Sequence, residues 1–308
     1  MNMNTNYSKF SEWLTLKGYS PGTIDTACLS VKYFALWATQ ENIPEWEEVS
    51  YSDAMGFIKW CSKRNVAKKT IAHYLIHVRH YYNFLISEGT TKENPVAHIK
   101  VQGIKRKIYY DVLNKEELQT LYQEYPVIIE VNKQMPPQQK NIISKRRNKV
   151  ILSLLIHQGL RVEEVAAIKL QDLQLREGKI TIHAQRRIAA RTMNLEPHQV
   201  YELMDYIHET RKEFLNDYGA TDKLFIQWKR GANFYGITQL MLKHLRKLNS
   251  RIKNFEQIRT SVVTHWLKQY DLRKVQYLAG HKYVSSTEAY KENIIDELQD
   301  DITKFHPL

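Results

Sequence analysis

Apolar residues in the first hundred positions recur three or four places apart, which is the spacing of amphipathic helices. Ser20-Pro21 is a typical helix start, since a Ser side chain caps free backbone N–H groups and Pro suits the first helical position. We expect Ser52 to cap the third helix, and Asn94-Pro95 to end the helical run. Of the four expected helices, the first begins near Tyr7 and the second contains Ile24. The third covers 52–62 and the fourth covers 67–89.

The helical pattern resumes at Asn114, which has the spacing of a capping box with Glu117. Segment 125–149 is less regular and reads as a loop followed by the start of a helix. Apolar and polar residues alternate at 179–183, and we expect a second short strand at 191–195. The pattern therefore predicts a mainly α chain with a small sheet in its second part.

A short basic segment separates the two parts. Residues 100–107 are basic and poor in large apolar side chains, which favours an interdomain linker, and we place that linker at 100–110. The length of 308 residues suits two domains. We therefore predict an N-terminal helical domain at 1–99 and a second domain at 111–308, whose last helix covers 291–308.

Positive charge is spread over both parts. The chain carries 45 Lys and Arg against 33 Asp and Glu, a net charge of +12, of which residues 1–107 contribute +5 and the remainder +7. A hydrophobic share of 43% and a charged share of 25% argue against disorder. The surplus indicates an anionic partner, with nucleic acid ahead of a membrane surface, but a basic protein without any polyanion remains an equal alternative on charge alone.

Other classes are disfavoured by what the sequence lacks. Two cysteines, Cys28 and Cys61, are too few for a disulfide framework or a four-thiolate zinc site, so we expect no structural metal. No apolar run approaches the roughly 20 residues that span a bilayer. The N-terminal residues are polar and do not resemble a signal peptide, and we therefore expect a cytoplasmic protein with no membrane association.

Four short motifs in the second part stand in a fixed order. They are Gly159-Leu160-Arg161 with Glu164, Ile258-Arg259, Leu278-Ala279-Gly280-His281, and Tyr290 nine residues after His281. Each motif alone is common, and each residue alone is better explained as a core or surface side chain. As an ordered set, downstream of a helical first part with a Ser-Pro-Gly-Thr helix start, they resemble the tyrosine recombinase (phage integrase) family.

This resemblance covers nearly the whole chain and implies both a fold and a reaction. The fold is a helical, SAM-like domain that clasps DNA, followed by a mostly helical catalytic domain with a small antiparallel β-sheet. Tyr290 attacks a DNA phosphodiester and leaves a 3′-phosphotyrosine, without metal, ATP or any other cofactor. Arg161 and Arg259 clamp the phosphate, and His281 donates to it or helps to deprotonate Tyr290. Glu164 is expected to orient the Arg161 guanidinium.

The sequence departs from the family pattern where the family has His-x-x-Arg. Here the motif reads Glu256-Gln257-Ile258-Arg259. A carboxylate facing a phosphodiester is electrostatically unfavourable unless it is protonated or paired. We therefore predict that Glu256 pairs with an active-site arginine or a backbone donor.

The expected β-hairpin also lacks the lysine that the family places in its turn. The turn reads Ala184-Gln185-Arg186-Arg187, and the nearest lysine is Lys179 at the start of the strand. Arg186 or Arg187 can neutralise charge and hold a water that protonates the leaving oxygen, but an arginine is a poor general acid. This departure predicts a slower enzyme, a substitute acid or a partly degenerate site.

Candidate DNA contacts outside the site come from basic residues of the first part and the linker. We expect phosphate contacts from Lys63, Arg64, Lys68, Lys69, Arg79, Lys105, Arg106 and Lys107. By resemblance, the helix at 291–308 packs into a neighbouring protomer of a tetramer on DNA, or alternatively onto its own domain. Accessory proteins are compatible with the resemblance.

The leading interpretation is a site-specific DNA recombinase or integrase of a mobile element, acting on a double-stranded recombination site. A non-catalytic DNA-binding or regulatory protein derived from such an enzyme is the main alternative, favoured by Glu256 and the absent hairpin lysine. A nicking enzyme that uses the same residues without pairing two sites is a third.

Overall fold

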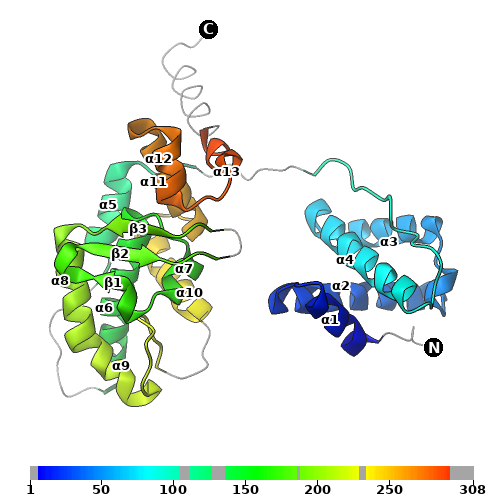
Figure 1. Cartoon of the computed structure of the whole chain (residues 1–308), viewed down its shortest axis with the longest axis horizontal. Helices are drawn as coiled ribbons and strands as arrows, with labels where there is room; N and C mark the ends of the chain where they lie inside the picture. The colour runs from blue at the N-terminus through cyan, green and yellow to red at the C-terminus, as the bar shows by residue number, and fades with distance from the viewer. Residues whose placement is uncertain (1–5, 105–110, 127–135, 186–187, 229–233, 292–308) are drawn as a thin grey trace, which may run out of the picture. The chain divides into compact units, whose positions relative to one another are not determined.

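The computed structural model describes residues 6–104, 111–126, 136–185, 188–228 and 234–291 (Figure 1). The chain divides into two compact units, Met1–Ile108 and Tyr109–Leu308. Each unit has its own hydrophobic core, as expected of separate domains.

Unit 1 is a helical bundle with an aromatic core. Phe10, Phe34, Phe57, Tyr81 and Tyr82 are all buried. The core continues past the last helix, because Val96 and Ile99 are also buried in it. The helices are α1 Tyr7–Leu16, α2 Pro21–Gln40, α3 Tyr51–Lys63 and α4 Lys68–Ser87, with a short 3₁₀ turn at Trp46–Glu48.

Helix caps explain where two of these helices begin. Ser20 accepts a hydrogen bond from the Thr23 N–H at the start of α2, as predicted. The predicted cap of α3 at Ser52 is wrong, because Ser50 occupies that position and forms a capping box with Asp53. Ser52 is the second residue of α3 and therefore lies within its first turn, after the cap position.

Unit 2 is mostly helical around a three-stranded antiparallel sheet. The strands β1 Leu173–Gln174, β2 Lys179–Ile182 and β3 Arg191–Asn194 lie in the order β1-β2-β3. Ile180 of β2 pairs with Met193 of β3, and both are buried. The helices are α5 Lys115–Gln123, α6 Pro136–His157, α7 Val162–Ala167, α8 Pro197–Asp205, α9 Arg211–Tyr218, α10 Phe234–Leu248, α11 Phe255–Gln269, α12 Leu272–Ala279 and α13 Val284–Glu288.

The mainly α architecture with a small antiparallel sheet confirms the fold class predicted from the sequence. The capping box of Asn114 and Glu117 is present at the start of α5. Helix α6 begins at Pro136, so it takes in most of the segment that the pattern left irregular.

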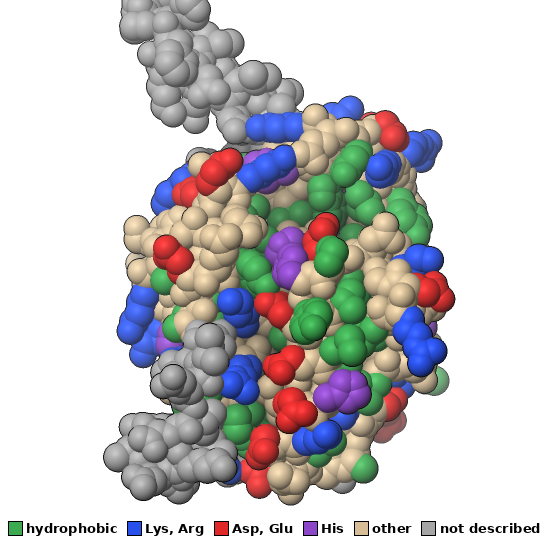
Figure 2. All heavy atoms as spheres, turned by 90° about the vertical axis from the view of Figure 1, so that its left-hand side faces the viewer, with side chains coloured by type: hydrophobic (Ala, Val, Ile, Leu, Met, Phe, Trp, Pro, Cys, Tyr) green, Lys and Arg blue, Asp and Glu red, His purple; other side chains and the backbone are tan. Residues whose placement is uncertain are grey.

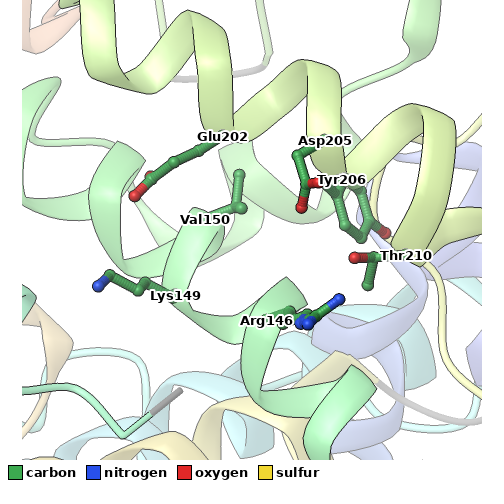
Figure 3. A pocket seen from close by; sticks show the side chains of 7 residues that line it. All are labelled: Arg146, Lys149, Val150, Glu202, Asp205, Tyr206 and Thr210. Atoms are coloured by element: carbon green, nitrogen blue, oxygen red, sulfur yellow. The ribbon is translucent and has the colours of Figure 1, made fainter. Parts of the chain in front are cut away.

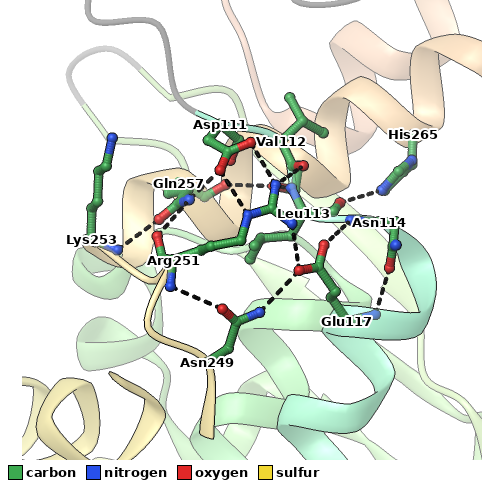
Figure 4. A network of polar contacts seen from close by, with 11 residues as sticks. Asp111, Val112, Leu113, Asn114, Glu117, Asn249, Arg251, Lys253, Gln257 and His265 are labelled. Atoms are coloured by element: carbon green, nitrogen blue, oxygen red, sulfur yellow. Dashed lines mark hydrogen bonds and ion pairs between the residues drawn. The ribbon is translucent and has the colours of Figure 1, made fainter. Parts of the chain in front are cut away.

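A polar network fixes the start of α11, the helix that carries the His-x-x-Arg equivalent (Figure 4). Arg251, in the loop before α11, pairs with Asp111 and with Glu117 of α5. Gln257, fully buried, donates to the carbonyls of Asp111 and Arg251 and accepts from the Lys253 N–H. Since Gln257 follows Glu256 directly, this network fixes the position of the first turn of α11.

Candidate active site

The four predicted catalytic residues come from four separate places in unit 2. Arg161 is the N-cap of α7, and Arg259 lies in the middle of α11. His281 follows Gly280, which ends α12 in the left-handed conformation, and Tyr290 follows α13. Direct contacts link Arg259, His281 and Tyr290, and the charge of Arg161 acts on both Arg259 and His281.

Arg259 is the buried cation of this group, with 1% of its surface exposed. Its guanidinium donates to the carbonyls of Gly159 and Ala279, and Nη2 lies 3.2 Å from His281 Nε2. Burial first, and then the charge of Arg161, lower the pKa of Arg259. Its Nε atom is buried without a hydrogen-bond partner in the described part of the chain.

His281 is held on both ring nitrogens. Nε2 faces Arg259, and Nδ1 lies 2.9 Å from Thr287 Oγ1. Its ring stacks on that of Tyr290, with the centroids 5.6 Å apart and the planes 23° apart. Burial first, followed by the charges of Arg259, Arg161 and Arg191, lowers the pKa of His281 to about 4. The ring is therefore neutral at pH 7.

Arg161 is the solvent-accessible cation of the group, and 31% of its side chain is exposed. Its Nη1 lies 3.5 Å from each carboxylate oxygen of Glu256, on the first turn of α11. This contact is the pairing that the sequence predicted for Glu256. The ion pair is partly exposed and therefore weak, so it can be exchanged for another anion.

Glu164 does not orient the Arg161 guanidinium, and that expectation is corrected. Its carboxylate accepts from the backbone N–H of Arg161 and pairs with Nη1 and Nη2 of Arg191, at 2.7 and 3.1 Å. Arg259 Nη1 is 3.8 Å away. The buried carboxylate of Glu164 thus contacts two guanidinium groups and one backbone N–H. The side chain of Arg161, at the N-cap of α7, instead contacts Glu256.

Arg191 was not among the residues predicted from the sequence. It is the first residue of β3, where exposed and buried positions alternate, and it shares the inward face with Met193. A charged residue at an inward position of an alternating strand indicates a buried partner, so the strand pattern could have identified Arg191.

The tip of the β2–β3 hairpin is anchored beside His281. Ile188 bridges to His281, and the Ala189 N–H donates to the Gly280 carbonyl. Gln185 is exposed and pairs with Ile188 across the turn. Arg186 and Arg187 lie outside the described residues. Lys179 stands at the opposite end of β2 from the turn and pairs with Glu177, which makes it unsuitable as a substitute for the hairpin lysine.

Most predicted DNA contacts of unit 1 are exposed, but one is not a free cation. Lys63, Arg64, Lys68 and Lys69 are exposed around the turn between α3 and α4. The guanidinium of Arg79 instead donates to the carbonyls of Val96 and Ile99 and ties the end of the unit to α4. Its prediction as a phosphate contact is therefore corrected. Lys105, Arg106, Lys107 and, apart from Lys291, the segment 291–308 that was predicted to be a helix lie outside the described residues.

Other charged residues of unit 2 have structural partners. Arg147 is 3% exposed and donates to the Ile226 carbonyl, so it cannot line a DNA surface. On the face seen in Figure 2, acidic, basic and hydrophobic side chains are interspersed, and no broad basic surface forms there among the described residues.

A cavity of about 320 Å³ lies between α6 and α8, and none of the four predicted catalytic residues lines it (Figure 3). Arg146 and Lys149 line it from α6, and Glu202 and Asp205 line it from α8. Its charges balance, so it offers no net attraction for a polyanion. Among the described residues, no group of His, Cys, Asp or Glu side chains has an arrangement that holds a metal ion. No helix in the described ranges is long and apolar enough to span a membrane.

Comparisons with known proteins agree on one family. The profile of the phage integrase family matches residues 112–295, and that of the phage integrase N-terminal SAM-like domain matches residues 9–89. Tyrosine recombinase XerC of Halalkalibacterium halodurans is 28% identical over 300 residues, covering 94% of this chain and 93% of that protein. Tyrosine recombinase XerD of Oceanobacillus iheyensis is 28% identical, with 89% and 88% covered.

Solved structures show the same fold. XerH recombinase bound to its difH substrate, in a pre-cleavage complex, has a TM-score of 0.68 at 16% identity and covers 93% of this chain and 82% of that one. A lambda integrase tetramer bound to a Holliday junction has a TM-score of 0.62 at 14% identity, with 92% and 75% covered.

Proposed function

Because this chain belongs to the phage integrase family of tyrosine recombinases, we propose that it is a site-specific DNA recombinase that cleaves and rejoins strands through a 3′-phosphotyrosine at Tyr290. The observation that carries the proposal is the grouping of a tyrosine, a neutral histidine and two arginines around Gly280-His281. Those are the groups that an attack on a phosphodiester requires: a nucleophile, a proton carrier and fixed positive charge.

Arg161 and Arg259 supply the fixed positive charge. Their mutual repulsion contributes to the lowered pKa of Arg259, and a bound phosphate relieves it. The relief is largest when charge builds up on the non-bridging oxygens in the five-coordinate transition state. The unpartnered Nε of Arg259 supports this role, since a buried donor gains most from a new acceptor.

Glu256 is proposed to leave Arg161 when DNA binds. Its carboxylate stands where it competes with a phosphate oxygen for the Arg161 guanidinium. The phosphate offers stronger charge-assisted hydrogen bonds to a planar guanidinium, and the partly exposed carboxylate is free to turn into solvent. We propose that the need to displace Glu256 from Arg161 slows the enzyme without abolishing the reaction.

No lysine in the described part of the hairpin can act as the acid for the leaving 5′ oxygen. We propose that a water held at the hairpin turn delivers that proton, with Gln185, Arg186 and Arg187 as the residues nearest in sequence. An arginine neutralises the alkoxide but does not give up its own proton at neutral pH.

DNA binding by unit 1 is proposed to centre on the start of α4. The N-cap Ala67 gives no side-chain hydrogen bond to the N–H groups of the first turn, and Lys68 and Lys69 stand in that turn. Cations at a helix N-terminus are unfavourable in isolation and become favourable when an anion binds there. A DNA phosphate fits both observations.

The wider setting is also proposed. We propose a cytoplasmic recombinase of a mobile element that acts as a homotetramer on a double-stranded site, with the segment after Lys291 linking protomers. A catalytically impaired, DNA-binding derivative is the second candidate, and the Glu256–Arg161 pair is the observation in its favour.

One experiment separates the two candidates. A binding site is first selected from a pool of random duplexes, and a nicked suicide duplex carrying it is then incubated with the protein. A covalent protein–DNA band that is absent with Tyr290→Phe supports the recombinase. Specific binding without any band supports the impaired derivative.

A further inference from the structure

His183 directly follows β2, two residues before Gln185, and forms a pair that the proposed reaction does not use. Its Nε2 lies 2.7 Å from Oδ1 of Asp172, whose side chain is 3% exposed. The other carboxylate oxygen accepts the Lys169 N–H, so the carboxylate is held on both sides. The histidine side chain is 65% exposed, and in the described part of the chain no hydrogen bond engages its Nδ1. One ring nitrogen is therefore fixed by a buried carboxylate while the other is open to water.

His183 lies on the face of the hairpin that leads to the candidate active site. Gln185 pairs with Ile188, and Ile188 pairs with His281. Residues that pair directly across antiparallel strands project on one face, and His183, two positions from Gln185, projects on that face too. Two strand spacings and two residues along the strand place the Cα atoms of His183 and His281 about 12 Å apart. A phosphodiester, a water and the imidazole side chain fill a span of that size.

A small polar cavity lies against His183. It has a volume of about 20 Å³ and is lined by polar side chains that include Glu164, Asp172, Thr181, His183 and Gln185. A cavity of this size with several polar partners accommodates one water molecule. Glu164 also lies 3.8 Å from Arg259 Nη1, so the cavity adjoins a residue that contacts the buried arginine. The hairpin therefore offers a place for a water beside a side chain that can carry a proton.

We propose that His183 is the proton source for the leaving 5′ oxygen and that Asp172 is the positioning residue that holds its imidazolium. This inference rests on the proposed function. As the Tyr290 oxygen bonds to phosphorus, the bond from phosphorus to the 5′ oxygen breaks, and its electron pair stays on that oxygen. The oxygen takes a proton from the water, the water takes one from the imidazolium, and the phenol proton passes to solvent. Rejoining returns the proton of the 5′ hydroxyl to the ring by the same path.

An imidazole suits this step, whereas the other side chains of the turn do not. It takes up and releases a proton near neutral pH, while a guanidinium keeps its proton. The amide of Gln185 donates hydrogen bonds but has no proton to give up. The buried carboxylate of Asp172 orients the ring and stabilises its charged form, as the carboxylate of a catalytic triad does. Histidine thus supplies the acid that the family pattern places on a lysine.

The first test compares two leaving groups. The selected nicked duplex is prepared with ordinary phosphodiesters, and also as a set in which sulfur replaces the 5′ bridging oxygen at each candidate position in turn. A sulfur leaving group is a much weaker base than an alkoxide and departs without a proton. We expect His183→Gln to slow covalent complex formation on the oxygen duplex by about 100-fold and to leave the rate on the sulfur duplex unchanged. Equal slowing on both duplexes, or none on the oxygen duplex, would overturn the inference.

Three further variants separate proton donation from general damage to the fold. Gln185→Lys, added to His183→Gln, places an ammonium acid in the turn and is expected to restore most of the rate on the oxygen duplex. Asp172→Asn slows the oxygen duplex in the wild type but adds little to His183→Gln, because it acts through the ring. An equal loss from Asp172→Asn in both backgrounds contradicts the inference. His208→Gln, at an exposed histidine of the segment Tyr206–Thr210, is the matched control and leaves both rates unchanged.

The behaviour of the wild type distinguishes failure of this inference from failure of the proposed function. A covalent complex with the sulfur duplex alone keeps Tyr290 as the nucleophile but shows that no acid operates, which overturns the role of His183. A wild type that reacts with neither duplex, despite confirmed binding, removes the proposed function and this inference with it.

Discussion

Arg191 of β3 and Glu164 of α7 form a bidentate ion pair in which neither side chain is exposed to solvent. Burial alone would raise the pKa of Glu164, but the hydrogen bonds and charge of Arg191, the Arg161 N–H and the charge of Arg259 together hold that pKa below its ordinary value. The pair also fixes Gly280, where an added Cβ would stand 2.2 Å from Arg191 Nη1. The residue before His281 must therefore be glycine for reasons of space as well as backbone conformation.

Breaking this pair from one side is expected to destabilise unit 2. Arg191→Met leaves the Glu164 carboxylate buried without its main partner, which costs about 3–5 kcal/mol of unfolding free energy. The double variant with Glu164→Gln should recover part of that loss. Urea denaturation measures both, and Lys179→Ala, which breaks the partly exposed pair with Glu177, is the control at below about 1 kcal/mol. A loss of that small size for Arg191→Met would contradict the prediction.

The features that the sequence predicted well are those with local causes. The helices, the Ser20 cap and the strand pairing follow from spacing and from residues a few positions apart. Ser50 was missed in favour of Ser52 because both fit the pattern, and only the reciprocal bond with Asp53 distinguishes them.

The features that were missed depend on distant parts of the chain. Glu164 of α7 meets Arg191, 27 residues away on β3, only in the folded chain. Arg79 finds the carbonyls of Val96 and Ile99 because the chain folds back onto α4. No local sequence pattern predicts such contacts between distant parts of the chain. Arg79, a basic residue on a helix, was therefore assigned to DNA, although its guanidinium donates hydrogen bonds to backbone carbonyls.

Glu256→Gln is expected to speed covalent complex formation. The neutral amide no longer competes with the phosphate for Arg161, and an exposed ion pair is worth up to about 1 kcal/mol, which gives a gain of roughly 2- to 5-fold. Single-turnover rates at low and moderate salt provide the measurement. Glu163→Gln, an exposed carboxylate on α7, controls for the general loss of one negative charge. A slower Glu256→Gln variant would instead show that the carboxylate takes part in the reaction.

Stability is expected to fall as the pH drops from about 6.5 to 4. The pKa of His77 in unit 1 and that of His281 in unit 2 are each lowered to about 4, chiefly by burial. Between that value and the unfolded pKa near 6.5, the unfolded chain binds the extra proton and the folded chain does not. Each group therefore lowers the free energy of unfolding as the pH falls through this window.

Thermal unfolding across this pH range tests the two units separately. In unit 1, His77→Gln removes the titrating group, and the amide can still donate to Ser30 Oγ, the partner of His77 Nδ1. We expect its transition to lose part of its pH dependence while that of unit 2 keeps its own. An unchanged pH dependence of unit 1 would mean that His77 is not the group responsible.

Salt dependence of DNA binding is expected to distinguish true phosphate contacts from basic residues with structural partners. Lys68→Ala and Lys69→Ala each remove a cation from the first turn of α4, so each should lower the slope of log K against log salt by about 0.9. Lys92→Ala, an exposed lysine outside the predicted contact surface, should leave the slope unchanged.

Arg79→Ala should also keep the slope but lower the stability of unit 1 by about 1–3 kcal/mol, because its bonds to backbone carbonyls are lost. Filter binding at several salt concentrations, together with urea denaturation, separates the two effects. A reduced slope for Arg79→Ala with unchanged stability would return that residue to the DNA surface, and an unchanged slope for both lysine variants would remove the start of α4 from it.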